Sequence, residues 1–438
     1  MAENKGLKKT LSPFMLWGLG VGYVISGMYF GWNLGLEKGG TGGMAIATIV
    51  IMVMYITFTF SYAELACAIP KAGGVFDYAN RAMGRNIGFI AGIAQIVEFI
   101  LAPPAIAFAI GAYFNAFFPQ VPILSSAIAI YFVFTALNVY GVKAAASFEV
   151  IITVLAVAEL LLFSGIALPK FEMANLQRNS FPNGWGGVFA AIPFAIWFFL
   201  GIEGIANVAE ETKNPQKDIS KGFGWAIFTL AILCVLIFIS ATGISGWEAI
   251  VYKNGLSGET SDSPLPLALA KITGSNHLMY HLLITVGLFG LVASFHGLIL
   301  AAGRSTYEMG RVHNIPSFLG KISSRFHTPA NALLGNMVIG ILALLSGKTS
   351  EIIIVSVFGA LTLYIISMIS IILLRKQEPG LHRPFRTPFY PVFPVVSLVI
   401  AVVSILAMLI YSFQLGLIYF SILIITFLLY KIFKRTDP

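Results

Sequence analysis

Charged side chains are scarce in this sequence of 438 residues. Only 11% of the residues are charged, whereas 58% are hydrophobic. A soluble domain averages about 25% charged residues, so this chain cannot cover a water-exposed surface with polar groups. The composition excludes a soluble protein, and it excludes a single membrane anchor attached to a large soluble domain. It predicts an integral protein of the lipid bilayer.

Cysteine and catalytic motifs are also scarce. Cys67 and Cys234 are the two cysteines, and both lie in apolar segments without the spacing of metal ligands. We find no nucleophile–base set and no phosphate-binding loop, because Gly20-Val-Gly22 lies inside an apolar segment. We therefore expect no enzyme activity, no cofactor and no metal site. The net charge of +8 does not indicate a nucleic-acid partner, since the basic residues form no soluble basic face.

Long apolar segments are abundant, and they indicate transmembrane helices. Barrel strands alternate apolar and polar side chains, whereas these segments are continuously apolar. The segments cover residues 12–35, 42–66, 88–116, 122–140, 146–168, 185–209, 222–245, 279–303, 329–346, 350–374, 391–413 and 415–431. We predict an all-α polytopic membrane protein with 12 transmembrane helices, located in the cell membrane.

The distribution of the 27 Lys and Arg residues predicts the orientation. An even number of crossings places both termini on one side, and cytoplasmic loops carry the excess of basic residues. Most of the basic residues fall in the loops on the side of the termini. Those on the other side are Lys38, Lys170, Arg178, Lys253, Lys271 and Lys348. We therefore expect both termini to be cytoplasmic.

Two segments carry glycines that a lipid-facing helix does not need. The first segment is rich in glycine between Gly18 and Asn33, and the sixth contains Gly201-Ile202-Glu203-Gly204. Close packing through small residues would explain the first segment equally well. Gly-interrupted segments in corresponding positions of two halves are typical of a transporter site built from broken helices.

The first and sixth segments are five crossings apart, and this spacing predicts two repeats. We expect one repeat of five helices at residues 12–168 and a second at residues 185–375. Two further helices would follow at residues 391–431.

Acidic side chains lie inside the predicted crossings, while every Lys and Arg lies in a loop or at the end of a crossing. Such acids are costly and usually functional, so they must be protonated, bonded to polar neighbours or neutralised by a bound cation. We favour Glu203, between two glycines, for a substrate or proton role, and Glu98, which precedes an expected helix disruption at Pro103-Pro104. Glu159 is interpreted as a structural acid, and Glu64 as a partner of a loop or gate.

Several other side chains are candidates for the same site. Tyr23, Tyr29, Trp197 and Phe199 could enclose an ammonium group by cation–π contact, although aromatic residues more often serve packing. His296 follows Ser294 in the eighth crossing. A buried histidine is usually only hydrogen-bonded, and a role as ligand or proton relay is the alternative.

Three separated motifs resemble the amino acid–polyamine–organocation (APC) permease superfamily. They are the run from Tyr62 to Tyr78, the run from Ala209 to Ile219, and Gly303–Arg311 followed by Thr328–Ala332. The resemblance implies the five-plus-five inverted-repeat transporter fold with broken helices 1 and 6. Within the superfamily, Leu16–Asn33 and Val97–Ala107 look most like ethanolamine permeases.

The resemblance also implies roles for single residues. It implies that the first broken helix binds substrate through its backbone at Ser26-Gly27, and that Trp197 is an occluding aromatic. Met28 stands where the family motif has its last glycine, so carboxylate binding at this helix end is not carried over. Some proton-coupled relatives carry a lysine in the fifth crossing, where this chain has Ala156.

The predicted function is a secondary transporter that moves a small organic amine cation, with ethanolamine favoured, by alternating access. A coupling proton or sodium ion is possible. The alternatives are a zwitterionic amino acid permease and an amine sensor without transport. The predicted substrate-binding residues are Glu203, Glu98, Ser26, Gly27, Tyr23, Ile25, Trp197, Phe199, Gly201, Ile202, Ser294 and His296.

Overall fold

The computed structural model describes residues 9–141, 145–255, 257–275 and 277–434. Within these residues the chain forms helices joined by turns, with isolated β-bridges in place of sheets. The α-helices are α1 (Pro13–Val24), α2 (Ser26–Tyr29), α3 (Asn33–Ala68), α4 (Val75–Met83), α5 (Arg85–Phe117), α6 (Ile123–Tyr140), α7 (Ala145–Ala167), α8 (Met173–Gln177), α9 (Gly184–Trp197), α10 (Pro215–Ser245), α11 (Glu248–Val251), α12 (Pro264–Thr273), α13 (Leu278–Arg311), α14 (Ala330–Leu344), α15 (Thr349–Gln377), α16 (Val392–Tyr411) and α17 (Phe413–Lys434). The 3-10 helices are η1 (Leu168–Lys170), η2 (Ile202–Glu211) and η3 (Ser317–Gly320).

The helices form a multi-pass membrane bundle. Among the described residues, 10 helical segments are long and apolar enough to cross a bilayer, and α9 with η2 counts as one of them. The shorter apolar helices α1 and α14 supply the two remaining predicted crossings. The all-α polytopic fold expected from the sequence is confirmed.

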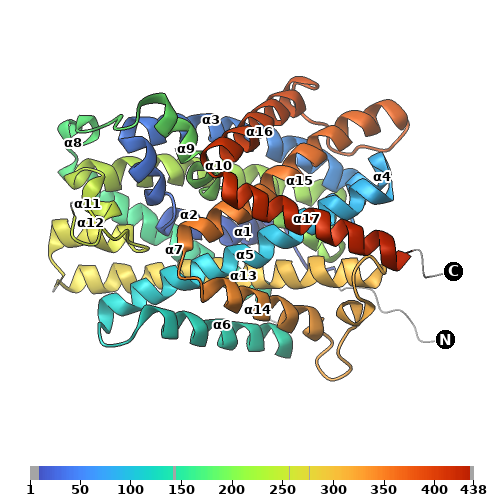
Figure 1. Ribbon diagram of the computed structural model, residues 1–438, viewed down its shortest axis with the longest axis horizontal. Helices are drawn as coiled ribbons and strands as arrows, with labels where there is room; N and C mark the ends of the chain where they lie inside the picture. Colours follow the sequence, from blue (N-terminus) through green and yellow to red (C-terminus); the bar gives the residue numbers. More distant parts are fainter. Residues whose placement is uncertain (1–8, 142–144, 256, 276, 435–438) are drawn as a thin grey trace.

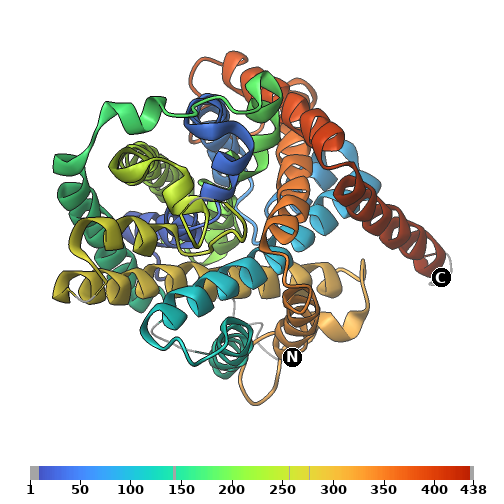
Figure 2. The ribbon, with the colours of Figure 1, turned by 60° about the vertical axis from the view of Figure 1, so that its left-hand side comes forward.

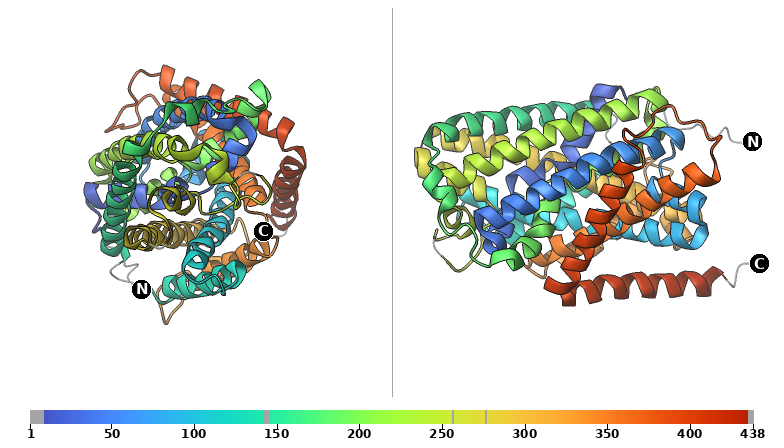
Figure 3. Two further views of the ribbon diagram at one scale, coloured as in Figure 1. Left: turned by 90° about the vertical axis from the view of Figure 1, so that its left-hand side faces the viewer. Right: turned by 90° about the horizontal axis from the view of Figure 1, so that it is seen from above.

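The helices run roughly along the long axis of the molecule, and both ends of the described chain lie at the same end of the bundle (Figure 1). Three crossings form the centre: α5, α9 with η2, and α15 are the most buried. The last helix, α17, lies at the rim of the bundle (Figure 2 and Figure 3). In its most apolar stretch 17% of the residues are buried, against 83% in that of α5. Its outward side chains, such as Ile425 and Leu428, are apolar and exposed, as expected of a surface that faces lipid.

The first crossing is broken, as predicted. Helix α1 ends at Val24, the single turn α2 follows, and Phe30 is extended before α3 begins at Asn33. Gly31 adopts φ +88°, a conformation that glycine reaches without strain. The Gly31 N–H donates to Asn33 Oδ1 at 3.0 Å, so the side chain of Asn33 replaces a helical acceptor at the break.

The sixth crossing is broken as well. Helix α9 ends at Trp197, and the 3-10 helix η2 begins at Ile202. Between them Gly201 takes the left-handed conformation with φ +100°. The expected interruption at Gly201 and Ile202 is therefore confirmed.

The two breaks pack directly against each other through glycines. A Cβ atom at Gly27 would collide with the backbone carbonyl oxygen of Trp197, and a Cβ atom at Gly204 would lie 2.7 Å from the Tyr23 ring. The glycines of the first crossing thus serve close packing as well as the break, so both explanations of the sequence pattern hold.

The expected helix disruption at Pro103-Pro104 is wrong. Helix α5 continues from Arg85 to Phe117 with both prolines inside it. Proline removes an amide donor from the helix ladder, but neighbouring helices can support the affected turn in a membrane bundle. Here α5 is the most enclosed of the long single helices, since its prolines and most of its side chains are buried.

The segment 246–263 covers one end of the first break. The short helix α11 lies in this segment, and α12 follows it directly. The side-chain amide of Asn33, which is fully buried, donates to the carbonyl oxygen of Ser261 at 2.8 Å. The loop is therefore fixed to the residue at which the broken helix resumes. The repeat boundaries 12–168, 185–375 and 391–431 stay a prediction.

Candidate functional site

Glu98 and Glu203 meet at the centre of the bundle, although they lie far apart in the sequence. Glu98 comes from α5 and Glu203 from the first turn of η2, and neither residue is exposed. Their carboxyl groups interact directly with each other. We call these two residues the acid pair. The break at Gly201 ends α9 and thereby places Glu203 opposite α5.

The acid pair has few partners. Tyr364 of α15 donates its hydroxyl hydrogen to Glu203 Oε2 at 3.0 Å. Apart from each other, both carboxyl oxygens of Glu98 and the Oε1 atom of Glu203 have no hydrogen-bond partner among the described residues. Among the ion pairs of the described residues, none joins a lysine or arginine to either acid. The carboxyl groups are therefore not neutralised by a basic side chain.

Helix α15 holds the other side of Glu98. The Ser356 hydroxyl donates to the Glu98 carbonyl oxygen at 2.9 Å. A Cβ atom at Gly359 would lie 3.0 Å from the backbone nitrogen of Glu98, so the two helices approach closely at this point. The carboxyl of Glu98 is thus carried by a backbone segment fixed to α15.

Aromatic rings extend from the acid pair. The hydroxyl groups of Tyr364 and Tyr55 are 2.9 Å apart, and Tyr55 also packs on Phe199 with ring centroids 5.1 Å apart. Phe58 lies against Tyr364 at 4.3 Å between centroids. We call Tyr55, Phe58, Phe199 and Tyr364 the aromatic wall. The sequence predicted Phe199 as a site residue, and it is connected to the acid pair through Tyr55.

Trp197 lies in a different place from the aromatic wall. It packs edge-on against Phe30, with centroids 5.4 Å apart, and its ring lies over Gly31. Its indole nitrogen is buried and has no hydrogen-bond partner among the residues that the structure describes. Trp197 therefore covers the break of the first crossing, as an occluding residue would.

Ser26 and Ser294 hold the first break together. The Ser294 hydroxyl donates to the carbonyl oxygen of Tyr23 at 2.6 Å, and its oxygen lies 2.8 Å from that of Ser26. Because a hydroxyl has one hydrogen, Ser26 must be the donor in the second contact. Ser26 retains lone pairs as an acceptor. Ile25, the predicted neighbour at this break, is fully buried.

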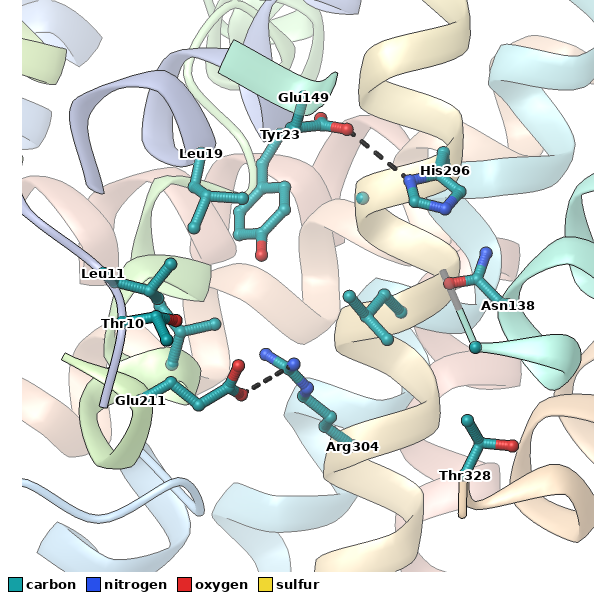
Figure 4. A pocket seen from close by; sticks show the side chains of 14 residues that line it. Thr10, Leu11, Leu19, Tyr23, Asn138, Glu149, Glu211, His296, Arg304 and Thr328 are labelled. Atoms are coloured by element: carbon teal, nitrogen blue, oxygen red, sulfur yellow. Dashed lines mark ion pairs between the residues drawn. The ribbon is translucent and has the colours of Figure 1, made fainter. Parts of the chain in front are cut away.

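A second cluster contains His296 and an acid that the sequence analysis overlooked, Glu149. The Nδ1 atom of His296 lies 3.5 Å from Glu149 Oε2, and the two side chains are 8% and 2% exposed. They line a cavity of about 290 Å³ together with Tyr23 and the ion pair of Arg304 with Glu211 at 2.7 Å. Figure 4 shows Glu149, from α7, and His296, from α13, pointing toward each other.

The sequence profile described as amino acid permease matches residues 11–429. The chain belongs to the amino acid permease family. The permease is 27% identical over 420 residues to the branched-chain amino acid permease BcaP of Bacillus subtilis, covering 89% of this chain and 86% of the relative.

Other relatives carry different names at similar identity. The permease is 26% identical to the methylthioribose transporter of Bacillus subtilis, over 89% of this chain and 86% of the relative. It is also 26% identical to the low-affinity putrescine importer PlaP of Escherichia coli, over 88% and 86% of the two chains. These names make the permease a transporter and not an enzyme, and they leave its substrate open among amino acids, amines and other small molecules.

The remaining buried acids of the permease are satisfied by donors. Tyr29 donates to Glu159 Oε2 at 2.6 Å, which agrees with the interpretation of Glu159 as a structural acid. Glu64 accepts two hydrogen bonds from Arg375, at 2.9 and 2.6 Å, and further ones from Thr387. Glu64 therefore binds the loop after α15, as predicted. By contrast, among the described residues Glu98 and Glu149 have no such donor, and Glu203 has one, Tyr364.

Proposed function

We propose that this permease moves a small organic amine cation across the cell membrane by alternating access. Ethanolamine is the substrate that we favour. The observation that carries the proposal is the acid pair, whose two buried carboxyl groups face each other and have no basic partner among the described residues. Two adjacent carboxylates cannot both be ionised in a low-dielectric interior without a counter-charge. A transported ammonium group supplies that charge for as long as it is bound.

The surroundings of the acid pair suit an ammonium group. An ammonium donates up to three hydrogen bonds, and the pair offers carboxyl oxygens that, among the described residues, accept none from a donor group of another side chain or the backbone. Ring faces near the carboxylates add cation–π attraction. The candidate rings are those of Tyr55, whose hydroxyl contacts that of Tyr364, and Phe199, which packs on Tyr55.

Three backbone donors at the first break are already used by the protein itself, and this supports an amine substrate. In carboxylate-binding sites, free backbone N–H groups at a helix end hold the carboxylate. Here the N–H groups of Ile25, Met28 and Phe30 already donate to carbonyl oxygens within the break. A neutral hydroxyl group on the substrate needs only one hydrogen-bond acceptor, and Ser26 can supply it. Such a hydrogen bond is worth about 0.6–2 kcal/mol in a membrane protein.

Alternating access would use the two broken crossings. In this proposal the repeats at 12–168 and 185–375 move relative to each other around the acid pair, with the helices of 391–431 outside the repeats. The excess of basic residues in the loops on the side of the termini supports a cytoplasmic location of both termini. The cavity beside Thr10 and Arg304 would then face the cytoplasm.

The test is counterflow of labelled ethanolamine in liposomes that contain the purified permease. We expect rapid exchange that unlabelled ethanolamine competes with and branched-chain amino acids do not. The amino acid permease named among the relatives makes a zwitterionic substrate the second candidate, and competition by free amino acids would favour it. Saturable binding in detergent without any exchange would instead indicate a sensor.

A further inference from the structure

Glu149 and His296 form a buried contact that the proposed substrate site does not use. Glu149 lies on α7 and His296 on α13, and their closest side-chain atoms are 3.5 Å apart. Both side chains are more than nine-tenths buried. Figure 4 shows the contact at one edge of the cavity, away from the ion pair of Arg304 with Glu211.

The contact is not that of a satisfied structural pair. A charge-assisted hydrogen bond has a donor–acceptor distance of about 2.7–2.9 Å, and 3.5 Å is well beyond this. Within the part of the chain that the structure describes, both oxygens of Glu149 and the Nδ1 atom of His296 are buried without a hydrogen-bond partner. Glu159, on the same helix, is satisfied by Tyr29 at 2.6 Å. A buried acid left without a donor is costly, and in membrane proteins such acids mark ion and proton pathways.

The charged and titratable groups around the pair are few. Among the described residues that line the cavity, they are Tyr23 from α1, Arg304 from α13 and Glu211 from η2. Arg304 and Glu211 neutralise each other in their ion pair. Within this cavity, then, His296 is the titratable group in contact with Glu149.

The pair also touches the first crossing just before its break. A Cβ atom at Gly22 would lie 2.8 Å from Glu149 Oε1, and one at Gly297 would lie 3.3 Å from the same oxygen. The ring of Tyr23 fills the space over Gly297. A change of charge on Glu149 therefore acts directly on the part of α1 that leads into the break.

We propose that Glu149 and His296 form a proton-binding site, separate from the acid pair, whose occupancy is coupled to substrate movement. One proton passes from water in the cavity to the carboxylate–imidazole pair and changes its net charge from −1 to 0. The proton is released when the site faces the opposite side of the membrane. Coupling presupposes the proposed transport function, and the experiment separates the two.

The experiment uses liposomes that contain the permease, with the membrane potential clamped by potassium and valinomycin. A gradient of one pH unit is imposed in either direction, and protein-free liposomes correct for diffusion of the neutral amine. One coupled proton gives up to about tenfold accumulation of labelled ethanolamine. We expect the permease to respond to the gradient, and ethanolamine addition to change the internal pH of lightly buffered liposomes.

Variants assign the response to the pair. Glu149→Gln mimics the protonated carboxyl, so we expect it to exchange ethanolamine in counterflow but to lose the response to the pH gradient. His296→Gln should weaken that response at least threefold. Glu159→Gln, on the same helix but bonded to Tyr29, is the matched control and should keep it.

The outcomes distinguish the two proposals. Absence of counterflow by the unaltered permease would refute the transport function itself. Counterflow without any response to the gradient and without a pH change on ethanolamine addition would overturn the proton site. The proton site would also be overturned if Glu149→Gln responded to the pH gradient as strongly as Glu159→Gln. If Glu149→Gln does not fold, the pH change measured on the unaltered permease still decides whether protons are coupled, and His296→Gln whether the pair is responsible.

Discussion

Tyr364 donates a hydrogen bond to Glu203 over 3.0 Å, and this contact joins α15 to the break of the sixth crossing. The same hydroxyl lies 2.9 Å from that of Tyr55 on α3. The Tyr364 hydroxyl thus links three helical elements, α3, α15 and η2. A movement of the sixth crossing away from α15 would break this contact. We therefore expect substrate binding to depend on it.

Tyr364→Phe should weaken ethanolamine binding. A hydrogen bond to a charged group is worth about 1.5–3 kcal/mol, so we expect the Kd to rise by about tenfold or more. Isothermal titration calorimetry of the detergent-solubilised permease measures this. Tyr55→Phe removes only the contact between the hydroxyl groups of Tyr55 and Tyr364, so its effect on the Kd should be smaller. Equal affinities for all three proteins would contradict a role of Tyr364 at the site.

Gly27→Ala should abolish transport and reduce the yield of folded protein. Its Cβ atom would meet the Trp197 carbonyl oxygen, which is backbone and cannot rotate away. Gly165→Ala is the matched control, since nothing lies within 4 Å of its Cβ position on α7. Alanine has the higher helix propensity by about 1 kcal/mol, so this control should keep or raise the thermal unfolding midpoint. Normal transport by Gly27→Ala would disprove the close packing of the two breaks.

Glu64→Gln should destabilise the fold without touching the acid pair. Glu64 is 1% exposed and pairs with Arg375 and Arg383, which would be left without a charged partner. Breaking such a buried pair costs about 3 kcal/mol or more. Glu378→Gln removes a similar contact with Arg81 at the surface and should cost about 1 kcal/mol or less. Thermal unfolding in detergent compares the two, and equal losses would show that burial does not matter here.

Asp77 predicts a pH dependence of stability. Burial, only partly offset by Lys71, raises the pKa of Asp77 from 3.8 to about 6. The folded state therefore holds this proton more tightly than the unfolded state. The resulting stabilisation is fully present below about pH 4 and is lost as the pH rises through about 6.

Asp77→Asn should remove the cost of the buried charge. We expect the variant to gain stability over the unaltered permease at pH 7.5, and the gain to shrink at pH 5, where Asp77 is largely protonated. Unfolding midpoints at the two pH values give the answer. A difference that does not change with pH would show that the Asp77 carboxyl does not titrate in this way.

Much of the fold could be predicted because the bilayer restricts the possible structures. Continuous apolar segments must form helices, and glycine clusters mark the places where a helix can break, as at Gly31 and Gly201. The prolines of α5 misled the prediction. A proline indicates a lost amide donor, but the sequence does not show whether neighbouring helices support the turn at Pro103.

The site was predictable in part. Glu98 and Glu203 were singled out because no basic residue lies at their depth, but their direct contact depends on how α5 packs against η2. Glu149 was overlooked, although it lies in an apolar segment like the other acids. The signal was present in the sequence as an acid three residues into the predicted fifth crossing. Its pairing with His296 depends on the distance between α7 and α13, which no sequence pattern gives.

The central claim is that the acid pair neutralises the cation that the permease carries. The most direct measurement is the rate of ethanolamine counterflow for Glu203→Gln and Glu98→Gln, with Glu159→Gln as the matched buried acid. We predict at least a tenfold loss for Glu203→Gln, a clear loss for Glu98→Gln, and a rate near that of the unaltered permease for Glu159→Gln. Undiminished counterflow by both variants of the acid pair would contradict the account.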